Sequence, residues 1–203
     1  LESVPKDGEA LDALGRLYES SQNAKSLSEV YARKAQLAED PAERHELLVK
    51  AGEAYEAAGD DVRAIEALRQ AVAIQKGLKV LLALEALFAR TRRAGEQADV
   101  LDQLADAVED DEQRKTFVLR RAQLLEREGN PGEALQGFGF ALQLSSLDAG
   151  AMAGLERLMG IETVRAEAAR LLEPCYRKQG DMKKLVEILE ARLLAGDASQ
   201  QTV

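Results

Sequence analysis

The segment Gly52–Val72, GEAYEAAGDDVRAIEALRQAV, returns 70 residues later as Ala122–Leu142, AQLLEREGNPGEALQGFGFAL. Each copy contains two runs of strong helix formers that meet at a glycine, Gly59 in the first copy and Gly129 in the second. This pattern predicts a pair of helices that is repeated along the chain. An internal repeat determines the fold class before any single motif does.

The correspondence extends well beyond these two segments, because residues 11–75 align with residues 81–145 without a gap. Matches between Ala or Leu residues carry little weight, since both residues are abundant here. Matches of Gly, Asp and Arg at the same offset carry the argument. The identical pairs include Leu14/Leu84, Leu17/Leu87, Val30/Val100, Ala35/Ala105, Asp40/Asp110, Arg44/Arg114, Gly59/Gly129, Ala64/Ala134 and Ala71/Ala141.

The composition predicts an all-α chain and excludes several classes of function. Of the 203 residues 46% are hydrophobic and only 4% are aromatic, and four prolines leave room for long helices. A net charge of −9 argues against nucleic-acid binding, and the densest basic cluster is only Arg90, Arg92 and Arg93. The longest apolar stretch, Val80–Ala89, is interrupted by Glu85 and is too short for a membrane span.

Helix boundaries are marked by caps and turns. Asp40 precedes a proline and a glutamate in the pattern of a helix N-terminus, and Gly59 and Gly180 each precede an aspartate that can cap the next helix. Short links make consecutive helices antiparallel, and stacked helix pairs form a superhelix with a concave face. The predicted helices are residues 8–21, 24–38, 42–58, 61–76, 78–91, 94–109, 111–128, 131–145, 148–160, 162–179 and 181–195.

Residues Leu48–Ala71 resemble a tetratricopeptide repeat. Its small and large apolar positions are taken by Leu48, Ala51, Gly52, Tyr55, Ala64, Leu68 and Ala71. The second block matches with Val118, Ala122, Leu125, Ala134, Phe138 and Ala141, and it departs at Arg121. The helix pairs at 8–38 and 78–109 fit less well, and residues 171–193 resemble residues 13–35. Between these segments, residues 148–170 predict a repeat that has lost a helix or been respaced.

The resemblance implies a right-handed α-solenoid of antiparallel helix pairs with about eleven helices. We expect one domain over residues 1–203, with repeat blocks at about 8–76, 78–145 and 148–195, in the style of a degenerate bacterial array. The chain starts at Leu1, so we expect a piece of a longer array. The compartment is left open, with the cytoplasm favoured.

Two residues could carry chemistry, and each also has a structural interpretation. His45 could act as a general base, but a position at the solvated rim of a helix is the simpler interpretation. Cys175 could be a nucleophile, but its place in the repeat corresponds to an apolar core residue. One cysteine and one histidine give no zinc-site spacing, so no metal, cofactor or catalytic residue is predicted.

Two short motifs have the same ambiguity. Gly137-Phe138-Gly139 lies inside a predicted helix and lacks the remainder of a phosphate-binding loop, so its glycines are expected to let a neighbouring helix approach. The acidic run Glu109–Glu112 could bind a cation or a basic peptide. Its alternative interpretation is a solvated turn that caps the next helix.

The resemblance also implies where a ligand would bind, because the first helix of each pair lines the concave groove in this family. The implied groove positions are Asp12, Arg16, Glu19, Glu46, Val49, Glu53, Glu56, Lys79, Leu82, Ala86, Ala89, Thr116, Leu119, Gln123 and Glu126. The basic clamp for carboxylate tails is not expected, since its ninth positions hold Arg16, Glu53, Ala86 and Gln123.

We therefore predict a non-catalytic protein–protein interaction scaffold. Its expected site consists of Arg16, Glu46, Val49, Glu53, Glu56, Leu82, Leu119 and Gln123, and its expected ligand is a protein or peptide with basic and aliphatic residues. The alternative is a structural spacer or a self-assembly module that pairs with other copies through apolar ends. An enzyme is the third alternative, and the lack of a catalytic set argues against it. Nucleic acid and membrane insertion are not expected.

Overall fold

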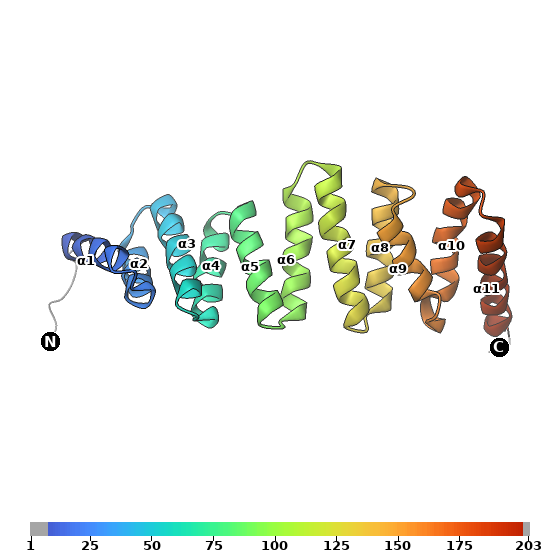
Figure 1. Ribbon diagram of the computed structural model, residues 1–203, viewed down its shortest axis with the longest axis horizontal. Helices are drawn as coiled ribbons and strands as arrows, with labels where there is room; N and C mark the ends of the chain where they lie inside the picture. The colour runs from blue at the N-terminus through green and yellow to red at the C-terminus, as the bar shows by residue number, and fades with distance from the viewer. Residues whose placement is uncertain (1–7, 201–203) are drawn as a thin grey trace. The chain divides into compact units, whose positions relative to one another are not determined.

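The computed structural model describes residues 8–200, with side chains up to Leu193, and these residues form eleven α-helices and no strand (Figure 1). The prediction of an all-α fold is confirmed. Ten predicted helices agree with the observed bounds to within two residues, and the last helix is longer than predicted. The helices are α1 (Gly8–Ser20), α2 (Ala24–Leu37), α3 (Pro41–Ala57), α4 (Asp61–Ile74), α5 (Leu78–Arg90), α6 (Ala94–Ala107), α7 (Asp111–Arg127), α8 (Pro131–Leu144), α9 (Ala149–Leu158), α10 (Glu162–Gln179) and α11 (Met182–Gln200).

The chain divides into two compact units, Leu1–Arg93 with α1–α5 and Ala94–Val203 with α6–α11. The boundary lies between α5 and α6, inside the helix pair predicted at 78–109. The predicted single domain over residues 1–203, whose terminal residues lie outside the described range, stays a prediction, as do the three repeat blocks and the handedness of the stack.

In unit 1, each helix packs against the next one along the chain, with α3 held between α2 and α4. Two residues of α3, Ala51 and Tyr55, are buried beside Ala64 and Leu68 of α4, and these are positions that the sequence marked as repeat positions. Gly52 permits the close approach, because a Cβ there would lie 2.6 Å from Leu68 Cγ. Burial of these apolar side chains is the main source of stability of the helix pair.

In unit 2, α7 lies between α6 and α8 in the way that α3 lies between α2 and α4. The remaining helices depart from this plan. Helix α9 has only 10 residues, and α10, with 18 residues, packs against α8, α9 and α11. The stretch 148–170 therefore forms a short helix and the start of a long one, and α10 belongs both to a pair with α9 and to a pair with α11.

Left-handed residues in the turns explain the period of 70. Residues Gln22, Gly59, Arg92 and Gly129 have positive φ and are spaced by 37, 33 and 37 residues. Two unequal spacings alternate, so a gapless match needs two helix pairs. The two turns without glycine belong to the pairs that fit the repeat pattern less well, and a non-glycine residue in this conformation costs about 1 kcal/mol.

Polar residues fix the corners between consecutive pairs. Asp40 and Asp110 cap α3 and α7 by accepting hydrogen bonds from Glu43 N at 2.9 Å and Gln113 N at 2.8 Å. Arg44 donates to Ala38 O at 2.6 Å, and Arg114 donates to Val108 O at 2.8 Å. These carbonyls follow the ends of α2 and α6, where no further helical N–H reaches them. The identical Asp and Arg pairs of the sequence are therefore structural.

Candidate functional site

The groove residues predicted in unit 1 lie on one side of α3 and on its neighbours α1 and α5. Glu46 and Glu53 are exposed, Val49 and Glu56 are half-buried, and Arg16 is exposed on α1. Leu82 on α5 keeps 40% of its surface exposed. The predicted residues therefore include both charged and apolar side chains that a ligand can reach.

Ion pairs neutralise much of the negative charge on this side of α3. Lys79 Nζ lies 2.5 Å from Glu53 Oε1, and Arg90 Nη1 lies 3.2 Å from Glu56 Oε1. Arg90 also binds Asp61 at 2.6 Å, and this hydrogen bond raises the pKa of the Arg90 guanidinium. Among the described residues, Glu46 has no ionic partner. The predicted acidity of this surface is therefore concentrated at Glu46.

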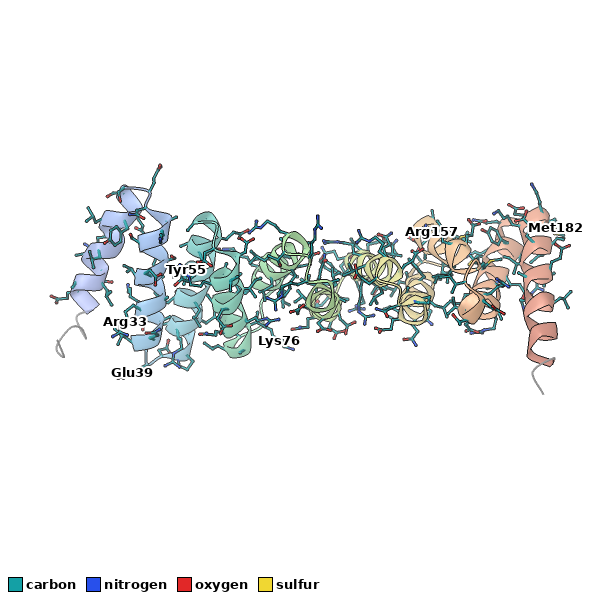
Figure 2. The ribbon with its side chains drawn as sticks, turned by 90° about the horizontal axis from the view of Figure 1, so that it is seen from below. Arg33, Glu39, Tyr55, Lys76, Arg157 and Met182 are labelled. Carbon is teal, nitrogen blue, oxygen red and sulfur yellow. The ribbon has the colours of Figure 1, made fainter. Side chains whose placement is uncertain are left out.

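The groove residues predicted in unit 2 lie on α7. Leu119 is half-buried and Gln123 is exposed. Near them Glu126 accepts two hydrogen bonds from Arg157 of α9, both at 2.7 Å (Arg157 is labelled in Figure 2). This bidentate pair ties α7 to α9 in the same way that the Glu56–Arg90 pair ties α3 to α5.

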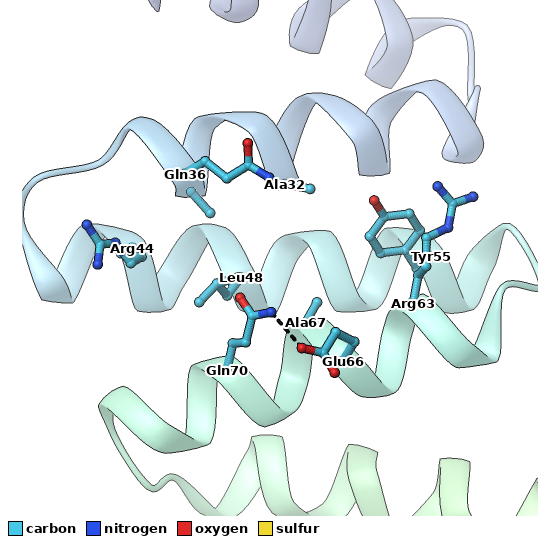
Figure 3. Close-up of a pocket in the computed structure, with 10 residues that line it drawn as sticks. Ala32, Gln36, Arg44, Leu48, Tyr55, Arg63, Glu66, Ala67 and Gln70 are labelled. Atoms are coloured by element: carbon cyan, nitrogen blue, oxygen red, sulfur yellow. Dashed lines mark hydrogen bonds between the residues drawn. The ribbon is translucent and has the colours of Figure 1, made fainter.

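The opposite side of α3 forms the floor of a groove that the sequence analysis did not single out. This first groove has a volume of about 450 Å³, with α2 and α4 as its walls. Figure 3 shows Arg44 at one end, Tyr55 and Arg63 at the other, and Leu48 and Ala67 between them. The centre of the groove is thus apolar and its ends are polar.

Unit 2 contains a groove of nearly the same size, about 440 Å³, over the floor of α7 and between α6 and α8. This second groove is lined by Leu101, Asp102, Ala105, Asp106, Arg114, Val118, Arg121, Gln136, Gly137 and Phe140. Eight of these ten positions lie 70 residues after a lining position of the first groove. The register of the repeat could have located both grooves, because it gives the helix faces that no neighbouring helix covers.

The two candidate catalytic residues have structural surroundings. His45 is half-buried, and its Nδ1 lies 2.9 Å from Ala71 O at the end of α4, so it is less solvated than predicted. Cys175 is buried with 4% exposure, and burial raises the pKa of its thiol. A protonated, buried thiol is a poor nucleophile. The two residues also belong to different units.

The two ambiguous motifs also have structural roles. A Cβ on Gly137 would lie 2.8 Å from Ala122 Cβ, and one on Gly139 would lie 3.2 Å from Leu171 Cδ1, so both glycines allow close helix packing as predicted. In the acidic run, Asp110 caps α7, Asp111 pairs with Arg114 at 3.1 Å, and Glu112 pairs with Lys115 at 2.7 Å. The run is an exposed helix start.

The described part of the chain contains no cluster of His, Cys, Asp and Glu that could hold a metal ion. Within the same part, no helix combines the length and the hydropathy that crossing a bilayer requires. These two observations leave the helix surfaces and the two grooves as the candidate sites.

Comparison with known proteins agrees with this architecture. The family model described as tetratricopeptide repeat matches residues 10–44, which comprise α1, α2 and the start of α3. The chain carries a tetratricopeptide repeat. The match falls on the pair at 8–38, which the sequence analysis ranked below the pair at 48–71. Tetratricopeptide repeats are in general a fold of protein–protein interaction scaffolds.

Solved structures show the same fold at low sequence identity. A tetratricopeptide repeat protein from Parabacteroides merdae is 14% identical, with a TM-score of 0.51 over 92% of this chain and 71% of that chain. The crystal structure of MamA is 15% identical, with a TM-score of 0.46 over 93% of this chain and 97% of that chain. A search of curated proteins found no significant match.

Proposed function

We propose that the protein is a non-catalytic interaction scaffold that binds a segment of a protein ligand on the exposed side of the first helices of its pairs. The observation that supports this proposal best is the surface shared by α3 and α5 in unit 1. The ion pairs Glu53–Lys79 and Glu56–Arg90 join the two helices and leave Leu82 exposed between its charged neighbours. A surface fixed in advance loses less conformational entropy when it binds.

The ligand that suits this surface carries an aliphatic residue for Val49 and Leu82 and a basic residue for Glu46. Glu53 and Glu56 already have cations beside them, so they contribute less attraction than their charge alone implies. Arg16 on α1 extends the surface in unit 1. Leu119 and Gln123 offer an equivalent surface on α7 in unit 2, with less charge.

Affinity capture from the source-cell lysate tests this function. The baits are the native chain, a Glu46→Lys, Glu53→Lys variant and a charge-matched control, Asp99→Lys with Glu190→Lys, whose two side chains are exposed. Mass spectrometry identifies the proteins that are bound. We expect a protein that the native and control baits retain and the Glu46/Glu53 variant loses. Thermal unfolding of all three baits checks that they are equally folded.

Self-assembly is the alternative function, and exposed apolar residues on α1 and α11 favour it. Met182, Val186, Leu189 and Leu193 form a stripe along α11, and Met182 is 71% exposed (Figure 2). On α1, Leu14 and Leu17 are 38% and 58% exposed, whereas their repeat equivalents Leu84 and Leu87 are buried. A capture that returns the same proteins on all baits, or only further copies of the chain, would replace the scaffold by this alternative.

A further inference from the structure

The first and second grooves share one frame but differ in their lining. The equivalent positions, 70 residues apart, are Ala32/Asp102, Ala35/Ala105, Gln36/Asp106, Arg44/Arg114, Leu48/Val118, Glu66/Gln136, Ala67/Gly137 and Gln70/Phe140. The arginine at the corner and the small residue on the wall are kept. The positions that face the open groove are changed, and these changes give the second groove a different chemistry.

One wall of the second groove is acidic. Asp102 and Asp106 stand one turn apart on α6, where the first groove has Ala32 and Gln36. Asp102 is held by Arg121, whose Nε lies 3.6 Å from Asp102 Oδ1, and Arg121 also binds Glu133 at 3.1 Å. Asp106 is exposed and has no ionic partner among the described residues. The wall therefore presents one carboxylate that is partly neutralised and one that is available.

The opposite wall, on α8, presents an aromatic ring to solvent. Phe140 is 42% exposed and lines the groove, where the first groove has Gln70. An exposed ring beside an available carboxylate suits a long basic side chain, because its aliphatic stem covers the ring while its cation reaches the acid. The floor, with Val118 and Gly137, leaves room for a neighbouring aliphatic side chain.

We propose that the second groove binds an extended peptide segment of a partner protein, in which a lysine or arginine lies next to an aliphatic residue. The cation pairs with Asp106 and Asp102, its stem lies on Phe140, and the aliphatic residue fills the groove over Val118. The volume of about 440 Å³ is in the range typical of ligand sites. This site is on the other side of α7 from Leu119 and Gln123, so it does not rest on the surface proposed above.

The first groove supplies the variants for a test, because its residues already fit the same frame. In an Asp106→Gln, Phe140→Gln variant, the second groove receives the residues of Gln36 and Gln70. The control is Glu46→Gln with Glu53→Gln, which removes more negative charge on the other proposed surface. Circular dichroism verifies that both variants are folded.

The probe is a fluorescein-labelled octapeptide of alternating leucine and lysine, and its binding is followed by fluorescence anisotropy. We expect the Asp106/Phe140 variant to lose about tenfold in affinity and the Glu46/Glu53 control to change by about twofold or less. An octapeptide of alternating leucine and glutamate should bind at least about tenfold more weakly to the native chain.

A gain of binding completes the test. Introducing Gln36→Asp and Gln70→Phe into the first groove should add a second binding event for the leucine–lysine probe. Equal affinity of the native chain and the Asp106/Phe140 variant would overturn the inference, as would equal binding of the leucine–glutamate probe. Loss of binding only in the Glu46/Glu53 control would overturn it as well, while leaving the proposed scaffold function in place.

Discussion

Helices α2–α4 of unit 1 and α6–α8 of unit 2 are two versions of one structure, and the residues they share differ in kind from those they do not. The capping aspartates, the corner arginines and the left-handed glycines are the same in both. The residues that face the two grooves are mostly different. Positions that satisfy the backbone are thus retained, and positions that face solvent are free to acquire a ligand.

A second difference lies in the core and is compensated within each unit. The pair Gly52/Ala67 of unit 1 corresponds to Ala122/Gly137 of unit 2, so the methyl group is on α4 in one unit and on α7 in the other. In unit 2 a second methyl group would lie 2.8 Å from the first. Each helix pair therefore has room for one methyl group at this contact.

The largest effect should come from the corner arginines. Arg44→Ala and Arg114→Ala each remove charge-assisted hydrogen bonds to carbonyls near the ends of α2 and α6. We expect each variant to lower the free energy of unfolding by about 2–3 kcal/mol, because hydrogen bonds from charged groups are worth more than neutral ones. Urea denaturation of the whole chain measures this loss.

The matched control is Arg33→Ala, since Arg33 is exposed and binds only Gln36 of its own helix at 3.0 Å. It should cost less than about 0.5 kcal/mol. A loss of that small size for Arg44→Ala or Arg114→Ala would mean that the shared arginines are not structural, and the distinction between frame and lining would fail.

A smaller effect should come from the exchanged methyl group. Gly137→Ala brings two Cβ atoms together, and overpacking of this kind costs about 1–3 kcal/mol, of which the better helix propensity of alanine returns about 1 kcal/mol. Ala122→Gly in the same chain recreates the pairing of unit 1 and should restore the stability. Gly132→Ala on the same helix, where a Cβ meets nothing within 4 Å, should not destabilise the chain. Stability that the double variant fails to recover would show that the two contacts are not equivalent.

Much of the frame could be predicted from the sequence, because caps, turns and small residues act locally and leave local signals. Asp40, Gly59 and Ala64 were all marked by identity at the offset of 70, and each has a structural role. The pairing of Glu53 with Lys79 could not be predicted in this way, because it depends on the distance between two helices. For the same reason the sequence overstated the acidity of the surface on α3.

The smallest effect concerns two buried tyrosines and compares the units at high pH. Burial raises the pKa of Tyr55 in unit 1, and Arg63, 4.6 Å over its ring, acts in the opposite direction. Burial also raises the pKa of Tyr176 in unit 2, and its hydrogen bond to Glu156 raises the pKa further, with no cation in opposition. We therefore expect native Tyr55 to ionise at a lower pH than native Tyr176, as measured by absorbance at about 295 nm in Tyr→Phe variants.

The direction of the stability change follows from these shifts. A tyrosine in the unfolded chain ionises near pH 10, and both folded tyrosines hold their protons more tightly. Their contribution to the free energy of unfolding is therefore complete below about pH 10 and is lost as the pH rises beyond it. The stability difference between the native chain and Tyr176→Phe should shrink above pH 10, and over a wider range than for Tyr55→Phe. The reverse order would show that the cation of Arg63 does not reach the Tyr55 hydroxyl, and that the two units treat their tyrosines alike.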